Sequence, residues 1–171
     1  MEVSQEPEQF PVEQHMAEQY LARAVELATN NVLNSGGPFG AIVVTADGQE
    51  FAGLNRVTAT LDPTAHAEVS AIRNACQGVG SFDLSGATLY TSCEPCPMCL
   101  ASALWARIGR VYFAADRHDA AAAGFDDALF YEYFDAGNDG ALMPVAQAIP
   151  STGNAVDPFD QWRNNEGRTD Y

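Results

Sequence analysis

Lysine is absent from this sequence. All eight basic residues are arginine, against 23 acidic residues, which gives a formal net charge of −15 at pH 7. Without lysine the chain has no amine for a Schiff base with pyridoxal phosphate and none for a phosphate-binding P-loop. The acidic balance also disfavours nucleic acid, because clustered basic side chains hold a phosphate backbone. We therefore exclude covalent amine catalysis and expect no nucleic-acid partner.

Long hydrophobic runs are absent too. The longest apolar stretches, around residues 39–44 and 100–106, are well short of the ~18 residues that a membrane-spanning helix needs. No basic residue precedes Arg23, so we expect no secretory signal, no membrane partner and a cytoplasmic location. A chain of 171 residues that is 47% hydrophobic and 18% charged is typical of one globular domain.

Apolar periodicity predicts how this domain is built. We expect a flexible N-terminal lead-in over residues 1–13, which are rich in Glu and Gln, and a folded domain over residues 14–171. Helices are predicted from residue 16 to near residue 36 and over residues 65–76, 95–106, 126–134 and 157–166. Strands are predicted over residues 39–45, 50–55, 87–92, 110–115 and 143–149. This order predicts an α/β fold: a three-layer α/β/α sandwich with a mixed central sheet of about five strands.

The cysteines indicate a metal site. Three of the four lie between residues 93 and 99, and such crowding in a chain without an export signal favours a metal over disulfides. An imidazole from His66 and two thiolates from Cys96 and Cys99 form a ligand set that zinc prefers, and a helix start beside the thiols favours their deprotonation. Three ligands leave one position for water, whose pKa zinc lowers to ~7.

Glu68 lies two residues after His66, and we assign it proton transfer rather than metal binding. An alternative remains open: Cys93 completes a closed structural site with His66, Cys96 and Cys99, in a binding or scaffold protein without chemistry. That arrangement leaves Glu68 without a purpose. The other two histidines and the fourth cysteine are interpreted as ordinary surface or core residues: His15, His118 and Cys76.

Three segments resemble the cytidine-deaminase superfamily. They are T-A-H-A-E-V (64–69), T-S-C-E-P-C-P-M-C (91–99) and A-G-F-D-D (123–127), and they are most similar to the bacterial guanine deaminases of that fold. The resemblance implies hydrolytic deamination of guanine to xanthine and ammonia, a step of guanine catabolism in purine metabolism. One Zn²⁺ per subunit is then held by His66, Cys96 and Cys99, with zinc-bound hydroxide as nucleophile and Glu68 as proton shuttle.

The resemblance also implies residues that contact the substrate. Asn55 matches a position that hydrogen-bonds the purine, and Asp127 matches one that accepts protons from the ring edge. Ala67 is placed at the substrate as well, and Phe39 and Trp105 match aromatic walls that enclose the flat ring.

The resemblance further implies that two subunits exchange their C-terminal segments. In the resembling enzymes the C-terminal segment crosses to a neighbouring subunit, so we expect a homodimer in which residues 157–171 are swapped and Tyr171 closes the neighbour's pocket. Substrates other than guanine stay open at this point, because deaminases of guanosine, ammeline, cytosine and adenosine in tRNA share the same core.

Overall fold

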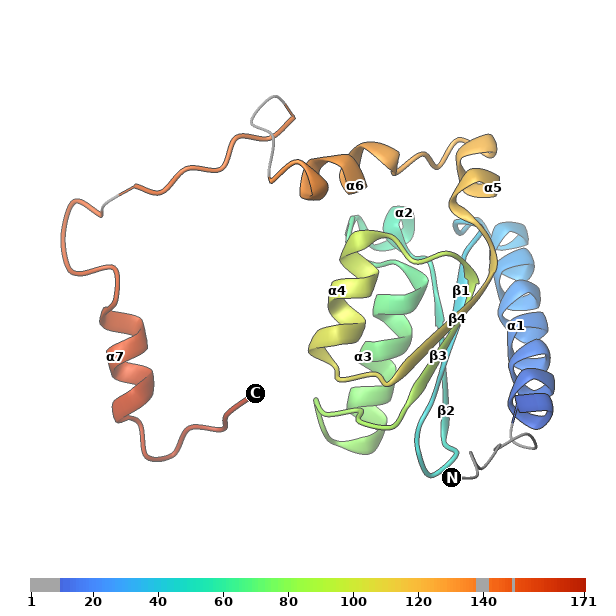
Figure 1. The fold of residues 1–171 in the computed structure, drawn as a ribbon, viewed down its shortest axis with the longest axis horizontal. Coiled ribbons are helices and arrows are strands. Elements are labelled where there is room, and N and C mark those ends of the chain that lie inside the picture. Colours follow the sequence, from blue (N-terminus) through green and yellow to red (C-terminus); the bar gives the residue numbers. More distant parts are fainter. Residues whose placement is uncertain (1–9, 138–141, 149) are drawn as a thin grey trace, which may run out of the picture. The chain divides into compact units, whose positions relative to one another are not determined.

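The computed structural model describes residues 10–137, 142–148 and 150–171 (Figure 1). These residues form two compact units, one ending at Ala128 and one spanning Leu129–Tyr171, where the sequence predicts one domain over residues 14–171. All residues predicted to bind the metal or the substrate belong to the first unit, except Tyr171.

A four-stranded sheet is the middle layer of the first unit. Its strands are β1 (Gly40–Val44), β2 (Glu50–Leu54), β3 (Thr88–Cys93) and β4 (Arg110–Ala115), in the order β2-β1-β3-β4. β1 is antiparallel to β2 and to β3, and β3 is parallel to β4. The expected mixed sheet is confirmed, with four strands in place of about five.

Helices cover both faces of this sheet. The helices of the first unit are α1 (Phe10–Leu33), α2 (Val57–Thr60), α3 (Ala67–Val79), α4 (Pro97–Trp105) and α5 (Arg117–Ala122). Figure 1 shows α1 on one face and α3 with α4 on the other, which confirms the three-layer sandwich. The short helices α2 and α5 were not predicted. In the part of the chain that the structure describes, no helix is long and apolar enough to cross a bilayer.

The first helix begins earlier than predicted. Residues 10–13, expected in a flexible lead-in, are helical, because α1 begins at Phe10. Pro11 is compatible with this start, since the first turn of a helix has no use for the N–H that proline lacks. The rest of the expected lead-in, residues 1–9, lies outside the described residues.

Alanines on α3 bring this helix close to the sheet. Ala67, Ala71 and Ala75 are completely buried and lie four residues apart on one helix face. On the sheet side, a Cβ at Gly53 of β2 would lie 2.2 Å from the backbone oxygen of Ala67 and from the backbone nitrogen of Ala71. Only glycine permits this approach. The contact fixes the N-terminal end of α3, which carries Glu68.

The second unit holds most of α6 (Ala128–Asp135) and all of α7 (Asp157–Asn164), both close to their predicted bounds. The strand predicted over residues 143–149 is not formed: the described residues 142–148 are irregular, and Ile149 lies outside the described residues. A strand needs a hydrogen-bonding neighbour, and no described residue of this unit belongs to one.

Candidate metal centre

Two helix N-termini carry the predicted metal ligands. His66 is the N-cap of α3 and Cys96 is the N-cap of α4, each with extended backbone. Pro97 at the first position of α4 suits a helix start, because its missing N–H is not needed there. The positive end of each helix dipole therefore points toward the donor atoms, which favours thiolate and carboxylate groups beside them.

The donor atoms have the spacing of a tetrahedral zinc site. Nδ1 of His66 lies 3.6 Å from Sγ of Cys96 and 3.5 Å from Sγ of Cys99, and the two sulfurs are 3.6 Å apart. Tetrahedral zinc with Zn–S bonds of about 2.3 Å and a Zn–N bond of about 2.0 Å requires edges of about 3.5 to 3.8 Å. Among the described residues these three form a group able to hold a metal ion, and their chemistry and size fit zinc.

Glu68 lies beside this group but inside the protein. Its side chain is buried, with Oε1 accepting a hydrogen bond from the Thr91 hydroxyl at 3.1 Å and Oε2 lying 3.5 Å from Sγ of Cys99. Burial raises the pKa of the Glu68 carboxyl. A carboxyl group that retains a proton more readily than usual, next to a metal site, is suited to proton transfer.

The two cysteine ligands titrate differently. Hydrogen bonds from Cys99 and His66 lower the pKa of the Cys96 thiol to about 4, whereas the bond with Cys96 and burial raise the pKa of Cys99. Two adjacent thiolates repel each other, so one ionises at the expense of the other. A divalent cation between the sulfurs favours both thiolates.

Cys93 is not part of the donor group. Its Sγ donates to the backbone oxygen of Asp116 at 3.7 Å, and burial raises its pKa to about 11. It is absent from the group of donors formed by the described residues. The arrangement leaves the fourth position of the metal free of a protein sulfur, which disfavours the closed Cys₃His site considered from the sequence.

Asn55 is held in place at the end of β2. It is 8% exposed, its backbone nitrogen donates to Phe39, and the next residue donates to Ala65, which directly precedes His66. Asn31, also buried, donates from Nδ2 to the backbone oxygens of Gly37 and Asn55. Asn55 is therefore fixed between the start of β1 and the segment that carries the His66 ligand.

Asp127 follows α5 and is half-buried. Burial raises the pKa of its carboxyl, and the charge of Cys96 raises it further. In turn, the carboxylate of Asp127 contributes to the raised pKa of His66, after the larger effect of the hydrogen bond with Cys96. Asp127 thus lies within electrostatic reach of the metal group.

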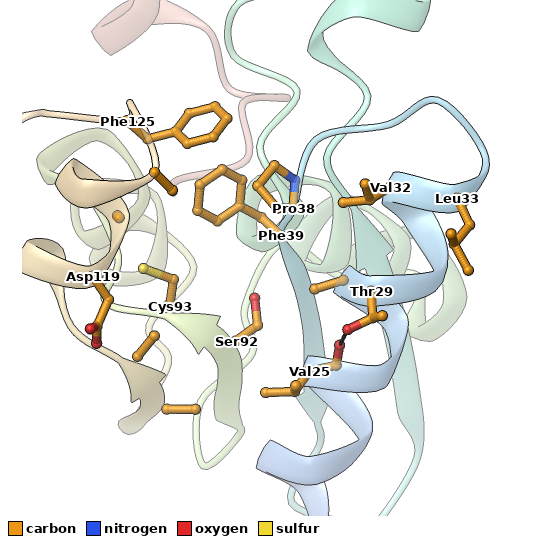
Figure 2. A pocket seen from close by; sticks show the side chains of 15 residues that line it. Val25, Thr29, Val32, Leu33, Pro38, Phe39, Ser92, Cys93, Asp119 and Phe125 are labelled. Carbon is orange, nitrogen blue, oxygen red and sulfur yellow. Dashed lines mark hydrogen bonds between the residues drawn. The ribbon is translucent and has the colours of Figure 1, made fainter.

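Phe39 lines an apolar groove (Figure 2). Its ring meets that of Phe125 edge-on, with centroids 5.0 Å apart and planes at 86°. The groove has a volume of about 570 Å³ and is bordered by α1, the end of β3, β4 and α5; its labelled walls include Val25, Ser92 and Cys93. Neither the three ligands nor Glu68 line it. One side of the Phe39 ring therefore faces this groove.

The other predicted substrate residues lie in different places. Ala67 is buried at the first position of α3. Trp105 is the last residue of α4 and is 70% exposed, about 13 Å along the helix from Cys96. Tyr171 belongs to the second unit, where its ring meets Trp162 edge-on with centroids 6.0 Å apart. Within the described unit, Trp105 is thus not brought to the metal group.

Three residues that were interpreted from the sequence as ordinary surface or core residues occupy such positions. His15 and His118 are exposed, and Cys76 is half-buried against the hydrophobic core. None of the three belongs to the donor group found among the described residues.

Sequence reasoning missed the side chains that support the site. Asn31 is 24 residues from Asn55, its hydrogen-bond partner. Glu94 lies inside the cysteine motif, but its partner Arg117 is 23 residues away. The position of Glu94 between Cys93 and Pro95 was the only local signal, and it did not identify a partner.

Comparison with known proteins supports this reading of the site. Residues 14–115 match the model of the cytidine and deoxycytidylate deaminase zinc-binding region. A guanine deaminase of Bacillus subtilis is 47% identical over 156 residues, which cover 90% of this chain and 98% of the relative. A tRNA-specific adenosine deaminase of Agrobacterium fabrum is 47% identical over 79 residues, which cover 46% of this chain and 51% of that protein.

Solved structures agree. The X-ray structure of the B. subtilis guanine deaminase has a TM-score of 0.83 at 46% identity and covers 90% of this chain and 98% of its own. A guanine deaminase from Nitrosomonas europaea has a TM-score of 0.59 at 34% identity and covers 63% of both chains. The matched region contains His66, Cys96 and Cys99 in the described geometry. The chain therefore belongs to the family of the cytidine and deoxycytidylate deaminase zinc-binding region.

Proposed function

We propose that this protein is a zinc-dependent aminohydrolase that converts guanine and water to xanthine and ammonia. One observation carries the proposal: a buried carboxylate, Glu68, lies 3.5 Å from a thiol of a three-donor group with zinc dimensions. The choice of guanine is supported by similarity to a guanine deaminase over 98% of that enzyme's length.

His66, Cys96 and Cys99 hold the metal in this proposal. When bound, zinc supplies a Lewis acid that makes water a nucleophile at neutral pH. The three donors come from the N-terminal ends of α3, which packs against the sheet, and of α4, which packs against α3. Their relative positions are therefore set by the fold before the ion arrives.

Glu68 moves the protons. Replacing the amine by oxygen requires removal of a proton from water, protonation of the adjacent ring nitrogen, and delivery of a proton to the departing ammonia. A single carboxyl group performs these transfers if it lies next to the reacting carbon and exchanges protons near neutral pH. Its burial and its hydrogen bond from Thr91 fix its position and raise its pKa.

Polar groups around the metal recognise the purine. Asn55 offers an amide that both donates and accepts, and Asp127 accepts from ring N–H groups. Ala67 and Phe39 provide apolar contact to the flat base. Trp105, exposed at the far end of α4, is not included in this contact. Loss of a hydrogen bond to a half-buried charge is costly, so Asp127 discriminates most strongly among bases.

A substrate panel tests the proposed reaction. Ammonia release should be fastest with guanine when guanine, guanosine, ammeline, cytosine and a tRNA containing the target adenosine are compared at equal concentrations. The zinc-loaded protein without substrate is the blank. Turnover of another compound but not of guanine would retain the chemistry and overturn the substrate, whereas no release from any of them would contradict the enzymatic function.

Replacing Asp127 by Asn is expected to lower kcat/KM for guanine about 10- to 100-fold, because the purine N–H groups lose a charged acceptor. Zinc content should not change, since Asp127 is outside the donor group. Steady-state kinetics and metal analysis measure both quantities.

Asp126 provides the matched control. It is exposed and accepts a hydrogen bond from the backbone nitrogen of Ala128. An Asp126→Asn variant should keep kcat/KM within about threefold of the parent. Equal losses in the two variants would show that Asp127 has no particular contact with the base.

A homodimer with exchanged C-terminal segments is also proposed. Every residue of 157–171 is exposed, including the aromatic side chains of Phe159, Trp162 and Tyr171. Apolar side chains of this size are normally buried against something. We propose that residues 157–171 pack on the partner subunit and that Tyr171 closes the partner's pocket.

Removing residues 157–171 is expected to lower activity about 100-fold, because the pocket loses its cover. Light scattering should give the full-length chain about twice its mass of 18.3 kDa. The exchange is tested by mixing the truncated chain with full-length Glu68→Gln chains, which lack the proton shuttle but keep the segment. Activity should return in the mixture. A mixture as inactive as its components would contradict the exchange.

A cytoplasmic location is proposed from the state of the cysteines. All four are free thiols, and two of them are metal ligands in this proposal. Thiolate ligands persist in a reducing compartment, where disulfide formation does not compete with metal binding.

A further inference from the structure

The loop between β3 and α4 carries the ligand Cys96. An ion pair between Glu94 of this loop and Arg117 joins the loop to α5. The two carboxylate oxygens of Glu94 accept three hydrogen bonds from Arg117. They come from the backbone nitrogen at 2.9 Å, from Nε at 3.1 Å and from Nη2 at 2.6 Å. The Glu94 side chain is 18% exposed and that of Arg117 is 36% exposed, so the carboxylate is the better shielded partner. The two guanidinium nitrogens both donate to Oε1 and the backbone nitrogen donates to Oε2, so the contacts fix the orientation of the carboxylate as well as its distance.

The helix that supplies Arg117 is itself fixed. Asp116 caps α5 by accepting hydrogen bonds from the backbone nitrogens of His118 and Asp119, and the Asp119 carboxylate accepts from the backbone nitrogen of Asp116. This reciprocal cap sets the direction of the first helical N–H groups. The N–H of Arg117 is one of them, and it points at Glu94. Glu94 thus occupies a favourable place for a carboxylate, at the start of a helix.

The end of β3, directly before this loop, is held by the segment that joins β4 to α5. The backbone nitrogen of Glu94 donates to the carbonyl of Ala115 at 2.8 Å, and Sγ of Cys93 donates to the carbonyl of Asp116 at 3.7 Å. Both backbone and side chain of Glu94 are therefore attached to the segment 115–117.

Cys96 follows Glu94 after a single proline. Pro95 and Pro97 on either side of Cys96 have restricted backbone rotation. Few rotatable backbone bonds therefore separate the clamped carboxylate from the ligand sulfur. A metal site tolerates little displacement of its ligands, because zinc requires bond lengths of about 2.3 Å to sulfur.

We propose that Glu94 and Arg117 are positioning residues for the zinc ligand Cys96, and that they set the zinc affinity of the site without touching metal or substrate. The inference rests on the zinc ligands of the proposed function but not on the identity of the substrate. If the protein binds zinc but does not deaminate guanine, the proposed reaction is overturned. The inference about Glu94 and Arg117 is then still tested by the zinc affinity of the variants.

The test measures zinc dissociation constants by competition with a chromogenic chelator, for Glu94→Gln, Arg117→Gln and the double variant. Each single variant should weaken zinc binding about 10- to 100-fold, the range found when groups that orient metal ligands are removed. The double variant should be no weaker than the worse single variant, because both changes break the same contact. Arg117→Lys should recover part of the affinity, since it keeps the charge but not the fork.

A second ion pair of the same unit is the control. Arg23 and Glu50 approach to 2.7 Å, on the surface beside α1, and Glu50→Gln should change zinc affinity by less than about threefold. Circular dichroism of each metal-free variant separates misfolding from weakened binding. The proposal is overturned if folded Glu94→Gln protein binds zinc as tightly as the parent, or if Glu50→Gln weakens zinc binding equally. It is supported if only the Glu94 and Arg117 variants lose affinity.

Discussion

Replacing Glu68 by Gln is expected to lower guanine turnover about 10²- to 10⁴-fold while one zinc ion per subunit stays bound. The amide has the size of the carboxylate and still accepts the hydrogen bond from Thr91, so packing should be retained. It cannot take up a proton from water or deliver one to the leaving amine, and general acid–base catalysis by one group is worth about 10²- to 10⁴-fold. Ammonia release and metal analysis on one preparation measure both properties.

The Glu68 result has two informative contrasts. Glu50→Gln changes an exposed glutamate on β2, outside the donor group, and should leave turnover within about threefold. Turnover of Glu68→Gln within tenfold of the parent would remove Glu68 from proton transfer. Loss of zinc from Glu68→Gln would show instead that this carboxylate is needed to hold the metal.

Replacing Cys99 by Ser is expected to abolish both zinc binding and turnover. Cys99 is completely buried, and a neutral hydroxyl is a much poorer zinc ligand than a thiolate. Because metal binding contributes directly to folding stability, the zinc-loaded parent should also melt at a higher temperature than the variant. Metal analysis after dialysis and thermal unfolding with and without added zinc provide the measurements.

Two other cysteines are controls for this experiment. Cys76→Ser alters a half-buried thiol outside the donor group and should retain zinc. Cys93→Ser should retain it as well, because that sulfur is directed to the carbonyl of Asp116. Loss of zinc from Cys93→Ser would support the closed site in which Cys93 is the fourth ligand. Full zinc occupancy in Cys99→Ser would exclude Cys99 as a ligand.

Local signals predicted most of the secondary structure near the site. The strand at residues 110–115 was predicted with the bounds that β4 has, and the helix predicted over residues 95–106 begins two residues later, at Pro97. The helix predicted over residues 65–76 ends three residues later, at Val79, where Gly80 takes the left-handed conformation that glycine adopts easily. Local signals therefore located these elements and placed their ends within about three residues.

Elements that depend on distant partners were harder to predict. The strand expected over residues 143–149 has the right composition, but strand formation needs an unpaired edge beside it. The short helix α5 was missed because its cap depends on side-chain bonds between Asp116 and Asp119 rather than on apolar periodicity. Trp105 was expected at the substrate, yet the length of α4 places it far from Cys96 along the helix.

The sequence by itself predicted a zinc site with His66, Cys96 and Cys99 as candidate ligands, because an imidazole and two closely spaced thiols are a ligand set that zinc prefers, but it left the role of Cys93 open. Only the tertiary structure decided which other residues lie beside the donor atoms and which hold them in place. It directed Cys93 away from the donor group, buried Glu68 beside Cys99, and joined Glu94 to Arg117. The reason is physical: ligand chemistry belongs to residue types and short spacings, whereas burial and contacts between distant residues depend on how strands pair and helices pack.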